Sequence, residues 1–172
     1  SIEERPKDVE RREVYGHWEM DTVVSGIGKG RGVLLVLTER YSREEKIIKL
    51  ANRKQESVIE AIDNLEREYG TKKFREKFIT ITTDNGVEFL DHRGITKVNR
   101  TKMYYAHAYS SWERGSNEVS NRLIRRFYKK GYNIDKISKR KVKELEDWIN
   151  NYPRKILGWK SANQFLKDKQ IF

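Results

Sequence analysis

The chain has 172 residues, which suits one domain with a substantial core. No run of eighteen apolar residues marks a membrane span, no apolar N-terminal segment marks a signal peptide, and the absence of Cys excludes disulfides and thiolate metal sites. The 37 basic side chains outnumber the 26 acidic ones, giving a net charge of +11. This balance leaves two interpretations open: a nucleic-acid partner, or a surface that is basic only for solubility.

The first elements in chain order form a predicted meander. Residues 1–13 are polar and charged, and we expect a linker or frayed tail there. The apolar run Val33–Leu37 predicts a strand buried on both faces. Closely spaced strands favour antiparallel pairing. The predicted strands cover residues 17–25, 32–39 and 44–50, with a Gly-rich turn at 26–30.

Helices dominate the rest of the chain. An apolar stripe predicts a helix over residues 54–69, with Gly70 as its stop signal. A short strand is predicted at 78–82, running up to Asp84, and another at 101–105. Two further helices are predicted at roughly 111–128 and 139–152. The pattern predicts a mixed α/β sheet flanked by helices.

Three acids stand at positions suited to a site. Asp21 lies inside a predicted strand, where a carboxylate is costly to desolvate unless it is paired or binds a metal. Asp84 directly follows a strand, although Asp-Asn-Gly is also an ordinary turn signal. Glu118 follows after 33 intervening residues, on the polar face of a helix where surface pairs with Arg122 and Arg125 would explain it equally well. Together, three carboxylates in a basic chain match the hard-oxygen site that Mg²⁺ or Mn²⁺ needs for phosphodiester chemistry.

Longer motifs around these acids resemble a known family. The resemblance rests on residues 16–21 (GHWEMD), 83–89 (TDNGVEF), 109–118 (YSSWERGSNE) and 151–159 (NYPRKILGW). These segments are similar to the integrase-like DDE superfamily and, more narrowly, to the IS-thirty family of insertion-sequence transposases. The similarity extends over nearly the whole chain, from about Arg5 to Phe165.

The resemblance implies a ribonuclease-H-like fold with a mixed five-stranded sheet. It implies a catalytic and metal-binding triad at Asp21, Asp84 and Glu118 that holds two Mg²⁺ or Mn²⁺ ions. The implied activity is phosphodiester hydrolysis and strand transfer at insertion-sequence ends, in the nucleoid of a bacterial cytoplasm. The implied partners are transposon-end and target DNA and further copies of the chain, with no membrane and no nucleotide cofactor.

The same resemblance implies how the domain is organised. Family members carry an N-terminal helix-turn-helix region, so residues 1–13 are expected to be a basic linker remnant. Residues 14–172 would then be the catalytic domain, with a C-terminal helical extension from about residue 136. Two alternative functions stay open: a nuclease of this fold without strand transfer, and a non-catalytic DNA-binding or dimerisation module.

Further residues are weighed by their surroundings. A basic cluster after the third acid is expected to contact DNA, although a solvated helix face stays open; its members are Asn121, Arg122, Arg125, Arg126, Lys129 and Lys130. His17 is expected to be hydrogen-bonded at the start of its strand. The separation of His92 and His107 argues against zinc. Trp112, Trp148 and Trp159 are expected to be packing anchors.

Two neighbouring glutamates compete with Glu118 for the role of third acid. Glu88 is four residues beyond Asp84, in the loop expected after the strand. Ser110-x-x-Glu113 has the pattern of a capping box, which would bond the Glu113 carboxylate to the backbone N–H of Ser110. Glu118 has no such local partner, so the sequence favours Glu118.

Overall fold

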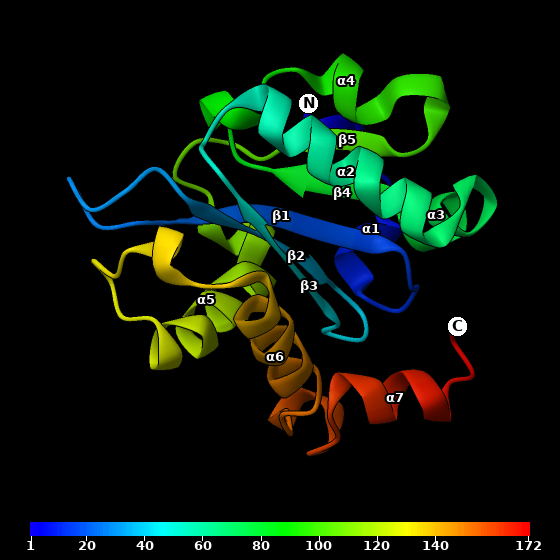
Figure 1. The fold of residues 1–172 in the computed structure, drawn as a ribbon. Coiled ribbons are helices and arrows are strands. Elements are labelled where there is room, and N and C mark those ends of the chain that lie inside the picture. The colour runs from blue at the N-terminus through cyan, green and yellow to red at the C-terminus, as the bar shows by residue number, and fades with distance from the viewer.

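One five-stranded sheet organises the molecule. The computed structural model describes residues 1–172, with the side chain of Ser111 left out. The strands lie in the order β3-β2-β1-β4-β5 (Figure 1). Their bounds are β1 (His17–Val24), β2 (Val33–Glu39), β3 (Glu45–Leu50), β4 (Thr80–Thr83) and β5 (Lys102–Tyr105). The first three pair antiparallel, whereas β4 and β5 run parallel to β1, so the predicted meander and mixed sheet are confirmed.

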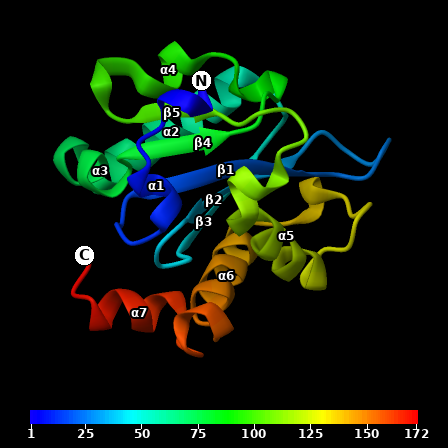
Figure 2. The same cartoon turned by 180° about the vertical axis from the view of Figure 1, so that it is seen from behind.

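Helices cover both faces of this sheet. Figures 1 and 2 show α2, α3 and α4 on one face and α5 and α6 on the other. The helices are α1 (Asp8–Arg11), α2 (Gln55–Tyr69), α3 (Thr71–Lys77), α4 (His92–Thr96), α5 (Gly115–Phe127), α6 (Lys139–Asn150) and α7 (Ala162–Asp168). The helix expected from about residue 111 begins at Gly115, because Ser111–Arg114 forms a 3₁₀ turn. Across the described residues, no helix has the length and apolar character that crossing a membrane requires.

Two apolar clusters hold the layers together, one on each face of the sheet. Leu35 on β2 joins Ile62 of α2 and Phe74 of α3 in one cluster. Val36, the next residue along the same strand, joins Ile124 of α5 and the helix α6 in the other. The apolar run in β2 therefore serves both faces, as predicted for a doubly buried strand.

The N-terminal segment is ordered, so the expectation of a frayed tail is wrong. Residues 1–13 contain a 3₁₀ turn and α1, and their Ile2, Arg5 and Val9 are buried. The segment is also not basic, because its four cationic side chains are outnumbered by Glu3, Glu4, Asp8, Glu10 and Glu13. It packs onto the sheet partly through polar contacts, such as that of Arg5 with Thr82, which sequence periodicity does not reveal.

The tryptophans divide into packed and exposed ones. Trp148 packs edge-to-face on Phe127, 4.7 Å between ring centroids, as expected of an anchor. Trp112 and Trp159 are instead 73% and 67% exposed, so the expectation that they are packing anchors is wrong. Trp18, in the first acidic motif, is fully buried and stacks on Phe78.

Candidate active site

Strand pairing brings two of the three predicted acids together. Strand β1 pairs in parallel with β4, with Glu19 opposite Thr82. Two residues further along, β1 continues through Asp21 while β4 ends and the chain reaches Asp84. Both carboxylates therefore emerge where the carboxyl ends of neighbouring parallel strands form a ligand site in α/β sheets.

Asp21 is held by hydrogen bonds on both oxygens. The backbone N–H of Thr22 donates to Oδ1 at 2.8 Å, and the amide Nδ2 of Asn121 on α5 donates to Oδ2 at 3.2 Å. Burial raises the pKa of the Asp21 carboxyl, and the nearby Asp84 charge raises it further, while Arg114 and the hydrogen bonds oppose this. A partly buried carboxylate beside another acid gains most from a cation.

A cationic side chain already lies between the two acids. One guanidinium nitrogen of Arg114 is 3.9 Å from Asp21 Oδ1, and another is 3.5 Å from Asp84 Oδ2. The Oδ1 atom of Asn121 is buried beside this site without a hydrogen-bond partner in the described structure. Two carboxylates that attract a cation, with an amide oxygen nearby, form a hard-oxygen donor set that fits Mg²⁺ or Mn²⁺.

Glu118 stands apart from this pair. It is exposed in the first turn of α5, and makes no ion pair or hydrogen bond with any side chain that the structure describes. Within the described residues, no three acidic or histidine side chains gather closely enough to hold a metal ion. However, Asn121, which bonds to Asp21, follows Glu118 by three residues, so the two side chains are neighbours on one side of α5.

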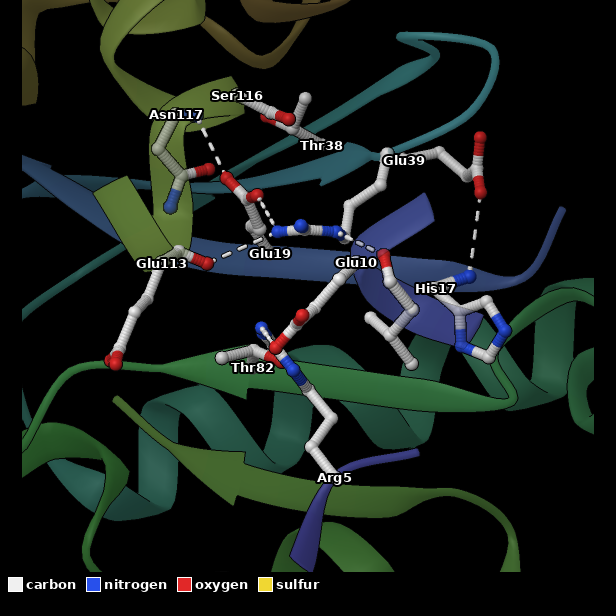
Figure 3. A network of polar contacts seen from close by, with 12 residues as sticks. Arg5, Glu10, His17, Glu19, Thr38, Glu39, Thr82, Glu113, Ser116 and Asn117 are labelled. Atoms are coloured by element: carbon white, nitrogen blue, oxygen red, sulfur yellow. Dashed lines mark hydrogen bonds and ion pairs between the residues drawn. The ribbon is translucent and has the colours of Figure 1, made fainter. Parts of the chain in front are cut away.

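A buried ion pair fixes α5 to the sheet beside Asp21. Glu19 is fully buried and bonds to the Arg40 guanidinium, and its other oxygen accepts from the backbone N–H of Asn117 at 2.9 Å (Figure 3). Arg40 also donates to the backbone carbonyls of Val9 and Glu113, at 3.0 and 3.1 Å. The pair thus joins β1, the N-terminal segment and the start of α5.

Sequence reasoning missed this pair, although one signal was present. Glu19 lies two residues before Asp21, on the same face of β1, and a second carboxylate inside a strand requires a partner. His17, on the same face, accepts or donates a hydrogen bond with Thr80 Oγ1 at 2.8 Å, which confirms its expected place at the strand start.

Glu113 does not form the expected capping box. Ser110 makes no side-chain capping bond, and the Glu113 carboxylate instead accepts from the backbone N–H of His107 at 2.8 Å. Its other oxygen lies 2.9 Å from His107 Nδ1. The local partner of Glu113 is therefore His107 in the loop before the 3₁₀ turn, which occupies both carboxylate oxygens.

The Glu88 carboxylate already has two partners, Thr22 and Arg53. One oxygen accepts from Thr22 Oγ1 at 2.8 Å and pairs with Arg53 Nε at 2.6 Å, while the other oxygen is buried without a described partner. A Cβ added to Gly86 would come within 2.7 Å of Glu88 and 3.0 Å of Asp84, so the chain passes very close to both acids there. Glu88 therefore links β1 to Arg53 and lies close to the turn that carries Asp84.

The predicted basic cluster divides between different surroundings. Asn121 bonds to Asp21, and Arg125 reaches the carbonyls of Val24, Tyr128 and Lys129 at 3.3–3.4 Å, near the end of α5. Arg122 and Arg126 are exposed and line a groove beside residues 152–159, where Arg126 also donates to Tyr152 Oη at 3.1 Å. Lys129 and Lys130 are exposed in the turn that follows.

Known proteins are similar to this chain over nearly its whole length. A protein 36% identical over 97% of this chain is described as a probable transposase for insertion-like sequence element IS1161 of Streptococcus salivarius. Another, 30% identical over 96% of the chain, is the transposase InsI for insertion sequence element IS30A of Escherichia coli. The chain spans 46% and 42% of the length of these two relatives. They bear out the resemblance to the IS-thirty family.

The fold also has a solved counterpart. The catalytic core domain of BIV integrase superposes with a TM-score of 0.62 over 91% of this chain and 97% of its own, at 17% identity. This likeness confirms the predicted ribonuclease-H-like fold. The integrase core domain model matches residues 11–111, which hold both Asp21 and Asp84. The chain therefore belongs to the integrase core domain family.

Proposed function

We propose that this chain is the catalytic domain of a DNA transposase, which cuts the ends of an insertion sequence and joins them to target DNA. The proposal rests on one observation. Asp21 and Asp84 meet at the carboxyl ends of two neighbouring parallel strands of an integrase core, with the Arg114 guanidinium between them. The family implies that a divalent metal is used, and the donor set is the one that suits it.

Each acid has a distinct place in the proposed site. Asp21 and Asp84 would hold Mg²⁺ or Mn²⁺ between them, and Glu118 would approach from α5 as the third acid. Bound there, two such ions activate an attacking oxygen and stabilise the leaving oxygen of the phosphodiester. Asn121 keeps the Asp21 carboxylate oriented through its hydrogen bond, and Arg114 must leave the space between the acids when a metal enters.

DNA would approach over the basic end of α5. We propose backbone contacts from Arg122, Arg126, Lys129 and Lys130, which are exposed. Asn121 and Arg125 already form hydrogen bonds with Asp21 and with the carbonyl of Val24. Their proposed DNA contacts would therefore be secondary to these intramolecular hydrogen bonds. Residues 1–13 would connect this domain to a preceding DNA-recognition region, and joining of paired ends would require at least a dimer.

The test is a cleavage and joining assay on oligonucleotides that carry an element end. The proposal expects products with Mg²⁺ or Mn²⁺, none with Zn²⁺ or EDTA, and none from the Asp84→Asn variant. Cleavage without joining would favour the nuclease alternative. DNA binding without either reaction, in the presence of Mg²⁺, would favour the non-catalytic module.

A further inference from the structure

A second site lies on the other side of α5. A groove of about 450 Å³ runs between this helix and residues 152–159. Val119, Arg122, Leu123 and Arg126 belong to its helical wall. At 100° per residue, these positions lie about 100–160° around the helix from Asn121, which bonds to Asp21. The groove is therefore separate from the two acids, although both use the same helix.

The groove carries a concentrated positive charge. Its lining includes Arg12, Arg43, Arg122, Arg126 and Arg154, and no acidic residue is among its described lining. Burial, together with repulsion from Arg12 and Arg40, lowers the pKa of the Arg43 guanidinium to about 10. With Lys155, six positive charges line the groove and repel one another, and an anion placed among them would relieve that repulsion.

Arg154 points to the same ligand. It is only 7% exposed, yet its Nε and Nη2 atoms have no hydrogen-bond partner in the described structure. The buried Glu45 acts on it electrostatically but makes no ion pair with it. A buried guanidinium whose N–H groups lack acceptors lowers the stability of the fold. A phosphate in the groove would accept hydrogen bonds from these N–H groups.

A flat aromatic surface stands beside these arginines. Trp159 is 67% exposed and has a φ of +66°, a left-handed conformation that non-glycine residues rarely adopt. Its loop is closed by two hydrogen bonds, from Trp159 N to Arg154 O at 2.8 Å and from Arg154 N to Lys160 O at 3.0 Å. A strained backbone that holds an indole in solvent is typical of a binding residue.

We propose that this groove binds an unpaired stretch of a DNA strand, with backbone phosphates on Arg122 and Arg154 and a base stacked on Trp159. The combination of guanidinium groups and an exposed indole matches the alternating phosphates and bases of a single strand. The idea rests on the proposed function, because DNA is the polyanion on which a transposase acts. An acidic peptide or a second copy of this chain would use the same charge, but neither requires a stacking plane.

Binding of a fluorescent oligothymidine in EDTA tests the groove without any catalytic step. Trp159→Leu should weaken binding about tenfold, the loss expected for one base stack, whereas Trp159→Phe should keep most of the affinity. Arg122→Ala should lower the slope of log affinity against log salt by about 0.7. The matched control is Arg93→Ala, which removes an exposed arginine on α4, across the sheet.

Three outcomes would overturn the proposal. One is a folded Trp159→Leu variant that binds as tightly as the parent protein, and another is equal binding of an oligonucleotide without bases. The third is that the groove variants change the sedimentation of the protein, or its binding of polyglutamate, while they bind oligothymidine as tightly as the parent protein does. Failure of the transposase proposal is distinguishable, because it would appear as no cleavage and joining by the parent protein with Mg²⁺, whereas oligothymidine binding is measured in EDTA without any reaction.

Discussion

At the scale of single residues, a buried ion pair helps to position the Asp21 carboxylate relative to α5. Glu19 and Arg40 lie almost entirely out of solvent and link the Asp21 strand to the start of α5. Such a pair contributes little net stability compared with apolar residues, but removing one partner leaves an uncompensated charge. Glu19 therefore acts on the site through position rather than chemistry.

Replacing Glu19 with Gln should destabilise the protein by about 3–5 kcal/mol, because Arg40 would stay buried without its counter-ion. Urea unfolding measures this loss. The matched control is Glu144→Gln, which removes one partner of the exposed Arg140–Glu144 pair and should cost less than about 1 kcal/mol. Equal effects of the two substitutions would show that the buried pair has no special role.

Glu45 predicts a dependence of stability on pH. Burial raises the pKa of this carboxyl to about 8, from an ordinary value of 4.5, against the opposing hydrogen bonds from Ser120 and Thr38. The folded protein therefore keeps a proton that the unfolded chain loses, so the stabilisation is complete below pH 4.5 and is lost as the pH rises through 8. Glu45→Gln should remove this decline. The unfolding free energies of parent and variant are measured from about pH 5 to about pH 8.5. The same dependence on pH in both proteins would contradict the role of Glu45.

At the scale of elements, the sequence predicts long strands and helices well and short ones poorly. The strand at Val33–Glu39 and the helix at Gln55–Tyr69 have apolar patterns long enough to be recognised. Helices α3, α4 and α7 have seven residues or fewer, and their apolar residues depend on contacts with distant segments. The two aspartates were identifiable from motifs, whereas Arg114 was not, because its partners lie 93 and 30 residues away.

The turn before α5 gives a prediction at this scale. Hydrogen bonds that the His107 ring donates to the carboxylates of Glu113 and Glu3 raise the pKa of His107, so the protonated histidine stabilises the turn. This stabilisation is present below the ordinary histidine pKa and is lost as the pH rises through the raised value. Glu113→Gln should lower the His107 pKa in an NMR titration, and shift the melting temperature by less than about 4 °C. An unchanged His107 pKa would contradict the observed contacts.

At the scale of the whole molecule, the net charge predicts how the chain would bind DNA in the proposed function. The net charge of +11 predicts binding to duplex DNA that is non-specific and strongly dependent on salt. Changing Lys129 and Lys130 together to Ala should reduce the slope of log affinity against log salt by about 0.9 for each phosphate that the lysines neutralise in the parent protein. The control variant replaces Lys72 and Arg93, exposed on the opposite face of the sheet. The same slope change in both variants would place the DNA elsewhere.

The central claim is that Glu118 completes a site with Asp21 and Asp84, although its side chain stands apart from them in this structure. Strand transfer of a pre-cut oligonucleotide end, with thermal melting as the folding control, tests it most directly. Glu118→Gln should abolish strand transfer and leave the fold intact. Glu113→Gln should keep most activity, and Glu88→Gln should at worst be intermediate, because both carboxylates serve neighbouring loops. Near-normal activity of Glu118→Gln, together with an inactive but folded Glu88→Gln or Glu113→Gln, would contradict the assignment.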